Sequence, residues 1–376
     1  MKGCPRTIDL ASAPKSALIA AIDPAGGTES SFEELDELGL LLSNLDVPVA
    51  GKVVQKRRAP DPSTFIGRGK ALEIRDFAAA LGANLLAVDD ALTPTQRSNL
   101  EKMTGLEVWD RAFTIMRIFE KRAITAEAKL QVELARLKYE IPSLKGLGRQ
   151  MSRLGGGIGT RGPGETEFER HRRKLERRVK YIEKHLQSVR KMRSLHRYRR
   201  SRDGIRLVSL VGYTNSGKST LLRSLAKDES IRAEDRLFST LDTLTKRVSC
   251  PARGRSFLMS DTVGFIKKLP PELVAAFRAT LEEASSADLL LVVTDASSPA
   301  PMENFEVVLG TLRDIGADEI PRFVVLNKID KVSDEIVFIS SGLSSRGEDV
   351  ICVSALTKEG LPALLDKICE KFEETR

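Results

Sequence analysis

The sequence is poor in cysteine, histidine and tryptophan, and it has no long apolar run. Its 376 residues include four cysteines, three histidines and one tryptophan. The cysteines are scattered without a CxxC pair, so neither a disulfide framework nor a zinc site is expected, and this usage suits a reducing cytoplasm. The early apolar run at residues 17–22 is too short for a signal peptide or a membrane span. We expect a cytoplasmic protein without stable membrane insertion, although partial membrane association stays open.

The positive charge is concentrated in one segment. Residues 144–202 hold 19 lysines and arginines against five acidic residues, a net charge of +14, which leaves −6 for the rest of a chain whose total is +8. This asymmetry is typical of a localised element that binds a polyanion. The length and the 41% hydrophobic fraction allow two or three domains with cores of their own.

Residues 212–219, which read GYTNSGKS, match the GxxxxGK[ST] pattern of a phosphate-binding loop. An apolar run at 205–211 precedes them and a helix-forming stretch follows, as this motif requires. Its glycines turn backbone N–H groups toward a polyphosphate, Lys218 reaches the β- and γ-phosphates, and Ser219 holds Mg²⁺. The flanking strand and helix disfavour the alternative of an ordinary glycine–serine turn.

Three shorter motifs follow at the ends of later apolar strands. DTVG at 261–264 offers the Asp261 carboxylate to Mg²⁺ and the Gly264 N–H to a γ-phosphate. NKID at 327–330 offers Asp330 to the two donors that guanine has and adenine lacks. SAL at 354–356 would place a backbone N–H near guanine O6. In this order the motifs predict a site for GTP rather than ATP.

Alternating strands and helices predict α/β domains at both ends of the chain. In residues 1–110 we expect strands at 16–22, 48–54, 84–88 and 106–109 with helices between them, and hence a small, mostly parallel α/β domain. In residues 204–376 we expect strands at 205–211, 257–260, 289–294, 323–326 and 350–353, and hence a doubly wound sheet that forms a P-loop domain.

Residues 111–203 are predicted to form a long antiparallel helical hairpin. Apolar residues recur every three or four positions in helices expected at 111–141 and 166–200. The connecting loop at 146–166 is rich in glycine and arginine, a composition that suits contact with a phosphate backbone. A solvated charged helix face is the alternative. The predicted RNA contacts are Arg149, Arg153, Arg161, Arg170, Arg172 and Arg173.

Two features of the first domain leave their roles open. The glycine-rich turn at 63–70, STFIGRGK, could bind a second nucleotide, contact RNA, or serve packing. Asp89 and Asp90 follow an expected strand, where capping of the next helix is a more ordinary role than catalysis.

These motifs together resemble those of the HflX family of translational GTPases. The resemblance extends over nearly the whole chain through GYTNSGKS, LFSTLD, DTVGF, NKID and SAL, through STFIGRGK, and most specifically through LGGGIGTRGPGETEFERHRR. It implies a GTPase that binds the 50S subunit near the peptidyl transferase centre of 23S rRNA. It also implies that the factor separates stalled or idle ribosomes, notably under stress. We expect a monomer that does not bind DNA. The resemblance assigns residues 238–242 as a first switch, with Thr240 as a second Mg²⁺ ligand.

The sites expected on this basis are as follows. Lys218, Thr240 and Gly264 are the expected catalytic residues, and Ser219, Thr240 and Asp261 the Mg²⁺ ligands. GTP or GDP is expected to contact Gly212, Tyr213, Thr214, Asn215, Ser216, Gly217, Lys218, Ser219, Thr220, Phe238, Ser239, Thr240, Leu241, Asp242, Asp261, Thr262, Val263, Gly264, Asn327, Lys328, Ile329, Asp330, Ser354, Ala355 and Leu356.

Phe265 bears on how such a GTPase is activated. It follows DTVG at the position where Ras-like enzymes carry a glutamine that orients the attacking water. We therefore expect slow hydrolysis by the free protein and stimulation by the ribosome. Asn215 resembles an asparagine that lets some related GTPases use K⁺, a role that stays open. The alternative functions are a large-subunit assembly GTPase, an ATP-driven RNA-remodelling protein, and a passive RNA-binding protein.

Overall fold

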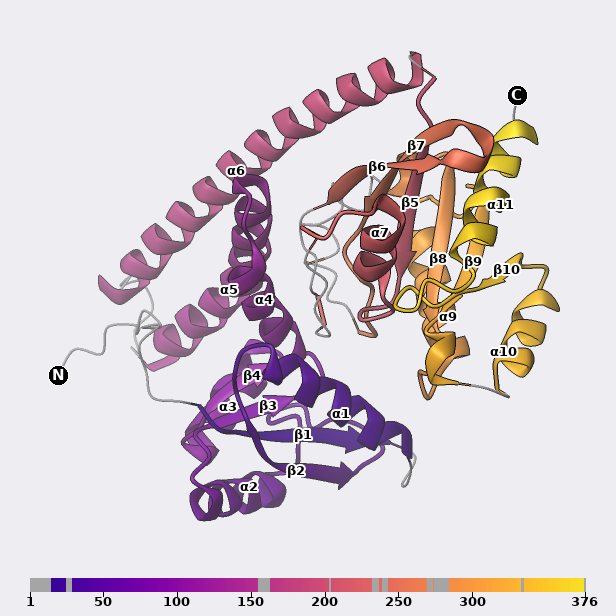
Figure 1. Ribbon diagram of the computed structural model, residues 1–376. Coiled ribbons are helices and arrows are strands. Elements are labelled where there is room, and N and C mark those ends of the chain that lie inside the picture. The colour runs from indigo at the N-terminus through magenta and orange to yellow at the C-terminus, as the bar shows by residue number, and fades with distance from the viewer. Residues whose placement is uncertain are drawn as a thin grey trace. The chain divides into compact units, whose positions relative to one another are not determined.

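The computed structural model describes residues 15–24, 29–154, 163–202, 204–231, 237–238, 243–268, 273, 284–332 and 335–374 (Figure 1). The chain divides into two compact units. One contains the residues up to Ile118 together with Glu140–Arg170, and the other contains Phe119–Tyr139 together with the residues from His171 onward. Each unit is built around its own sheet, the first parallel and the second parallel except for one edge strand.

The first sheet has four parallel strands in the order β2-β1-β3-β4. Apolar residues of α2 and α3 pack on one face of it, and the buried leucines of α1 lie on the other face (Figure 1). The elements are β1 (Ala17–Asp23), α1 (Glu29–Ser43), β2 (Val49–Lys56), α2 (Arg68–Leu81), β3 (Leu85–Val88), α3 (Pro94–Thr104) and β4 (Glu107–Asp110). The predicted parallel α/β domain is confirmed.

The second sheet has six strands in the order β10-β9-β8-β5-β7-β6. Helices α7 and α11 supply much of the core on one face of its central strands (Figure 1). The elements are β5 (Leu207–Gly212), α7 (Lys218–Ala226), β6 (Leu244–Cys250), η1 (Pro251–Arg253), β7 (Arg255–Asp261), η2 (Ala284–Ser286), β8 (Leu289–Asp295), α9 (Pro301–Asp314), β9 (Arg322–Asn327), η3 (Ile329–Lys331), α10 (Glu335–Ser344), β10 (Val350–Cys352) and α11 (Leu361–Glu374). The doubly wound fold is confirmed; the antiparallel edge strand β6 was not predicted.

The helix predicted at 111–141 is two helices, α4 (Arg111–Arg122) and α5 (Ala126–Leu154). The break lies before Thr125, whose hydroxyl accepts a hydrogen bond from Ala128 N at 3.1 Å and so begins a new helix. The apolar spacing continues across the break, which is why the sequence pattern concealed it. Part of the loop predicted at 146–166 is also helical, since α5 extends to Leu154 and α6 (Pro163–Arg202) begins at Pro163.

Helices α5 and α6 pack through a seam of leucine and isoleucine side chains. Leu134, Leu137, Ile182 and Leu186 are all buried in this seam. Charged pairs flank it, with Arg178 Nε and Nη2 lying 2.7 and 2.8 Å from the two carboxylate oxygens of Glu133. The predicted helical hairpin is therefore held by apolar packing, as its heptad-like spacing indicated.

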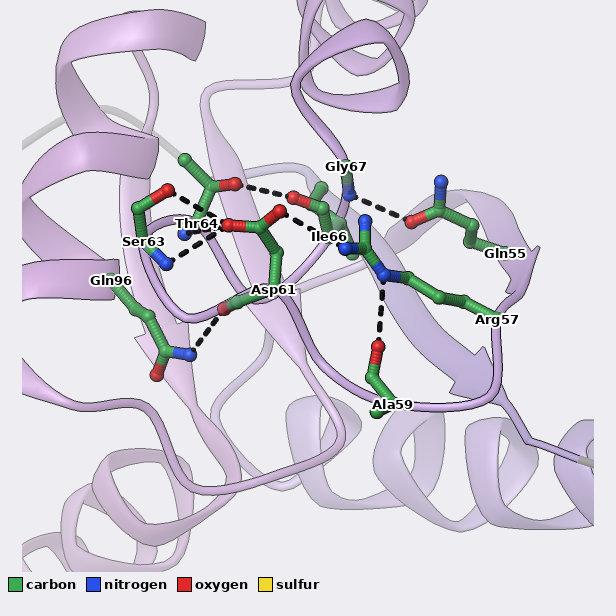
Figure 2. A network of polar contacts seen from close by, with 9 residues as sticks. All are labelled: Gln55, Arg57, Ala59, Asp61, Ser63, Thr64, Ile66, Gly67 and Gln96. Carbon is green, nitrogen blue, oxygen red and sulfur yellow. Dashed lines mark hydrogen bonds and ion pairs between the residues drawn. The ribbon is translucent and has the colours of Figure 1, made fainter.

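The turn between β2 and α2 is organised around the Asp61 carboxylate (Figure 2). Its Oδ1 accepts hydrogen bonds from Ser63 N and Ser63 Oγ at 2.9 and 2.8 Å and from Thr64 N at 3.3 Å. Its Oδ2 lies 3.1 Å from Arg57 Nη2. The Ser63 hydrogen bonds, with help from Thr64 and Arg57, lower the pKa of Asp61 to about 2.

This turn packs against the rest of its unit. Phe65 and Ile66 are buried in the core, and Gln96 Nε2 donates to Asp61 O at 2.8 Å. Gly67 N donates to Gln55 Oε1 at 2.8 Å (Figure 2). Of the roles left open for residues 63–70, packing is the one these contacts show.

Asp89 takes part in a buried ion pair and not in a helix cap. Its Oδ1 lies 2.5 Å from Arg111 Nη1, and Glu37 binds the same guanidinium. Burial alone would lower the pKa of Arg111, but Asp89 and Glu37 outweigh it and raise that pKa. Helix α3 is capped instead by Thr93, whose side chain accepts from Gln96 N. Asp89 is thus a structural residue.

Candidate nucleotide-binding site

The phosphate-binding loop connects β5 to α7, and two of its glycines are required by close contacts. Gly212 has φ 156°, and a Cβ there would lie 2.3 Å from Val293 O. Gly217 has φ 90°, and a Cβ there would lie 2.3 Å from Asn327 Nδ2. Any larger residue would push the loop away from β8 and β9. The glycine positions of the motif are therefore set by packing as well as by backbone conformation.

Lys218 begins α7 and turns its ammonium group back over the loop. Its Nζ donates to Gly212 O at 3.1 Å and to Tyr213 O at 2.7 Å. Burial lowers the pKa of Lys218 to about 8; Asp261 opposes this shift and Lys328 adds to it. A polyphosphate would supply the negative charge that this buried cation lacks.

Ser219 and Asp261 meet at the start of α7 and the end of β7. Ser219 Oγ donates to Asp261 Oδ2 at 2.6 Å, and both side chains are buried. A hydroxyl and a carboxylate are hard oxygen donors, the kind that Mg²⁺ prefers. The two residues therefore fit a magnesium ion, and the Mg²⁺ site stays a prediction. Thr262 is fixed beside them, because its Oγ1 donates to Leu210 O at 2.7 Å.

Asn327, in NKID, connects this motif to the phosphate loop and to SAL. Its Nδ2 donates to Ser216 O in the phosphate loop at 2.9 Å, and its Oδ1 accepts from Ala355 N at 2.9 Å. Ser354 Oγ in turn donates to Asp330 Oδ1 at 2.6 Å, while the Asp330 residue is exposed. The carboxylate is therefore held in place with an open side for a base. The structure brings together the motifs that the sequence placed at separate strand ends.

Phe265 is paired to the phosphate loop and turned into the core. Its backbone N donates to Gly212 O at 3.0 Å and its O accepts from Thr214 N at 2.7 Å, which forms a bridge to Tyr213. Its side chain is 2% exposed. Lys267 N adds a hydrogen bond to the Tyr213 hydroxyl at 2.9 Å. In this conformation Phe265 cannot orient a water molecule at a phosphate.

The remaining predicted residues are placed as follows. Asn215 is exposed with φ 59°, Thr220, Lys328 and Ile329 are half-buried, Val263 is buried and Leu356 is exposed. Phe238 is buried against Phe119, with ring centroids 4.7 Å apart. Ser239, Thr240, Leu241 and Asp242 lie outside the described residues.

The predicted RNA contacts are described only in part. Arg170 and Arg173 are exposed on α6, and Arg172 is half-buried with its Nε 3.2 Å from Glu176 Oε1. Arg161 and the side chains of Arg149 and Arg153 lie outside the described residues.

Asp295, which pairs with Lys328, was not predicted from the sequence because no motif marks it. The only available signal was its place at the end of an apolar strand.

Family models match three consecutive parts of the chain. They are described as "GTP-binding GTPase N-terminal" at residues 32–120, "GTP-binding GTPase Middle Region" at 122–200 and "50S ribosome-binding GTPase" at 207–328. A GDP complex of SsGBP has a similar fold, with a TM-score of 0.53 at 27% identity over 96% of this chain and 99% of that one. The fold and the site therefore define a GTP-binding P-loop GTPase.

Similar proteins of known name identify the family. GTPase HflX of Caldanaerobacter subterraneus is 45% identical over 98% of this chain and 83% of its own length. GTPase HflX of Escherichia coli is 41% identical over 92% of this chain and 80% of its own length. The chain belongs to the HflX family and is a GTPase. No helix in the described parts of the chain has both the length and the apolar character to cross a membrane.

Proposed function

We propose that this GTPase binds the large ribosomal subunit and, in its GTP-bound form, dissociates stalled or idle ribosomes into subunits. The observation that carries the proposal is the burial of Phe265, which leaves the GTPase site without a water-orienting side chain at that position. A site of this kind suits an enzyme whose hydrolysis depends on a partner. The description "50S ribosome-binding GTPase" for residues 207–328 supports the ribosome as that partner.

The helical hairpin is the proposed contact with 23S rRNA. Residues 144–202 carry a net charge of +14, and Arg170 and Arg173 are exposed on α6. Arginine side chains of this kind bind phosphates with forked hydrogen bonds, and binding that rests on many such contacts weakens with salt. The proposed domains are residues 1–110, the hairpin 111–203 and the GTPase domain 204–376, in a monomeric, cytoplasmic protein.

The chemistry proposed for the site rests on Lys218, Ser219 and Asp261. Ser219 and Asp261 would hold Mg²⁺, with Thr240 as a further ligand, and the ion would neutralise charge on the phosphates. Lys218 would move from the loop carbonyls to the phosphates, and the Gly264 N–H would contact the γ-phosphate.

Asn215, exposed in the loop, would hold a K⁺ ion. We therefore expect faster GTP turnover in KCl than in NaCl, and this difference should be lost in Asn215→Ala.

The decisive experiment combines sedimentation and turnover. Incubating 70S ribosomes with the protein and a non-hydrolysable GTP analogue should convert 70S particles into subunits, and adding 50S subunits should raise the rate of GTP hydrolysis. Unchanged sedimentation together with binding to immature particles would favour a large-subunit assembly GTPase. ATP turnover that survives Lys218→Ala would favour an ATP-driven RNA-remodelling protein.

Matched charge reversals test the hairpin. Arg170→Glu with Arg173→Glu should weaken 50S binding by more than about tenfold and reduce its salt dependence, since each lost phosphate contact removes released counterions. Arg313→Glu with Lys367→Glu, which reverses two exposed charges on α9 and α11, should leave binding unchanged. Equal effects of the two pairs would show that only the total charge matters.

A further inference from the structure

Thr214, in the phosphate-binding loop, has a buried hydroxyl without a hydrogen-bond partner. The residue is 6% exposed, and its Oγ1 has no partner among the described residues. Burying a hydroxyl without a partner is unfavourable, so such groups in native proteins are usually satisfied by a ligand or an ordered water molecule. Its backbone needs no further partner there, since Thr214 N donates to Phe265 O at 2.7 Å.

The contacts of Thr214 place it at the end of the site where DTVG meets the lysine. A Cβ on Gly264 would lie 2.9 Å from Thr214 Cα, 3.0 Å from Thr214 Cγ2 and 3.0 Å from Lys218 Nζ. Gly264 is the residue whose N–H senses a γ-phosphate in this class of enzyme. Thr214 therefore lies beside the two groups that respond to the third phosphate of GTP.

Ser216 provides a contrast within the same loop. Its Oγ is also buried without a partner among the described residues, but it lies only 3.1 Å from a Cβ built on Gly212, beneath the loop at the end of β5. It lies beside Gly212 and not beside Gly264. Of the two residues whose hydroxyls have no partner, only Thr214 has atoms, its Cα and Cγ2, beside Gly264.

We propose that the Thr214 hydroxyl donates a hydrogen bond to an oxygen of the γ-phosphoryl group and so helps the enzyme to distinguish GTP from GDP. A neutral hydroxyl bound to a charged phosphate forms one of the stronger hydrogen bonds in proteins. The contact would exist with GTP and be lost with GDP. The hydroxyl would add one side-chain hydrogen bond to those that the loop's backbone N–H groups make with the phosphates. Phe265 supplies no such polar side chain.

Thr214→Val tests the proposal, because valine has the shape of threonine and lacks the hydroxyl. Equilibrium binding of a non-hydrolysable GTP analogue and of GDP should be compared in the wild-type protein and the variant. The expected result is an approximately tenfold loss of affinity for the analogue with GDP affinity unchanged. Thr214→Ser, which keeps the hydroxyl, should restore most of the loss. Thr311→Val on α9, whose hydroxyl donates to Val307 O, is the matched control and should change neither affinity.

Thermal unfolding of the nucleotide-free protein gives an independent readout. If the hydroxyl has no protein partner, Thr214→Val should leave Tm unchanged or raise it by about 2–4 °C, because an unsatisfied buried group has been removed. A fall in Tm would mean that the hydroxyl serves the free protein and would overturn the proposal. An equal loss for analogue and GDP, or no loss for either, would overturn it as well.

Discussion

Lys328 Nζ lies 2.7 Å from Asp295 Oδ2, so an ion pair connects the NKID motif to the end of β8. Lys328 has a left-handed backbone with φ 62°. Asp295 is itself held, since its Oδ1 accepts from Ser297 N at 2.9 Å and from Ser297 Oγ at 2.7 Å. Both charged side chains are less than one fifth exposed. The Lys328 side chain in the NKID motif is therefore held in place by Asp295.

Asp295→Asn should weaken GTP and GDP binding to the same degree, by about threefold to tenfold. The substitution keeps the shape of the side chain but removes the charge that holds Lys328 and offsets its repulsion of Lys218. Fluorescent-nucleotide titration would measure the two affinities. Asp288→Asn is the control, since Asp288 accepts from Leu207 N at 2.7 Å at the other end of β5 and should not affect binding. A loss confined to GTP would contradict this account.

Asp330→Asn should weaken guanine nucleotides by at least about 100-fold and shift preference toward xanthine nucleotides. Ser354 Oγ donates to Asp330 Oδ1 at 2.6 Å and so orients the carboxylate, while the residue stays exposed. An amide there presents a donor to the guanine N–H groups, whereas xanthine offers a carbonyl. Competition between GDP and XDP would measure the shift. Ser354→Ala should cause only a small loss for both; an unchanged preference in Asp330→Asn would remove Asp330 from base recognition.

Nucleotide binding should be coupled to proton uptake near pH 8. Burial lowers the pKa of Lys218 from 10.5 to about 8, and bound phosphates should raise it again. At pH 8 about half of the free molecules would then need to gain a proton on binding. Calorimetry of GDP binding in two buffers with different ionisation enthalpies would give this number. At pH 7 the uptake should be close to zero, and uptake that does not depend on pH would contradict the prediction.

Asp61 should make the first unit sensitive to acid. Its pKa is about 2 in the folded protein against an ordinary value of 3.8, so the unfolded chain takes up a proton first as the pH falls. The stability that Asp61 contributes is present above pH 4 and is lost between pH 4 and pH 2. Asp61→Asn should therefore flatten the acid limb of an unfolding curve recorded for this unit. The same acid limb in both proteins would show that other carboxylates dominate.

The parts of the site that sequence could predict are those fixed by local backbone demands. GYTNSGKS requires glycine at Gly212 and Gly217, because a Cβ at either would lie 2.3 Å from a neighbouring strand residue. The strand ends follow from apolar runs, and parallel strands bring their carboxyl ends to one edge. For these reasons the fold class and the GTPase motifs could be predicted from the sequence.

Side-chain pairs between residues far apart in the chain could not be predicted from the sequence. The bond from Asn327 to Ser216 joins residues 111 positions apart, and nothing in either local pattern specifies it. Asp295 lies in no recognisable motif. The position of Asp89 at a strand end favoured a helix cap, whereas its carboxylate pairs with Arg111. The start of α5 was missed for a different reason: its capping residue, Thr125, lies within an unbroken apolar spacing.

Phe265→Gln should not create a faster GTPase, although it restores the residue that Ras-like enzymes use. The side chain is 2% exposed, and its backbone is paired to the phosphate loop by bonds from Phe265 N to Gly212 O and from Thr214 N to Phe265 O. A glutamine held in this position would bury an amide and lose the apolar contacts of the ring, at a cost of about 2–4 kcal/mol. We expect a lower Tm, while the rate of GTP hydrolysis by the free protein should be unchanged.

The control is Phe265→Leu, which keeps an apolar side chain and should lose less stability. A rise in intrinsic turnover for the glutamine variant would mean that this segment leaves the loop readily, and that the buried conformation does not limit hydrolysis.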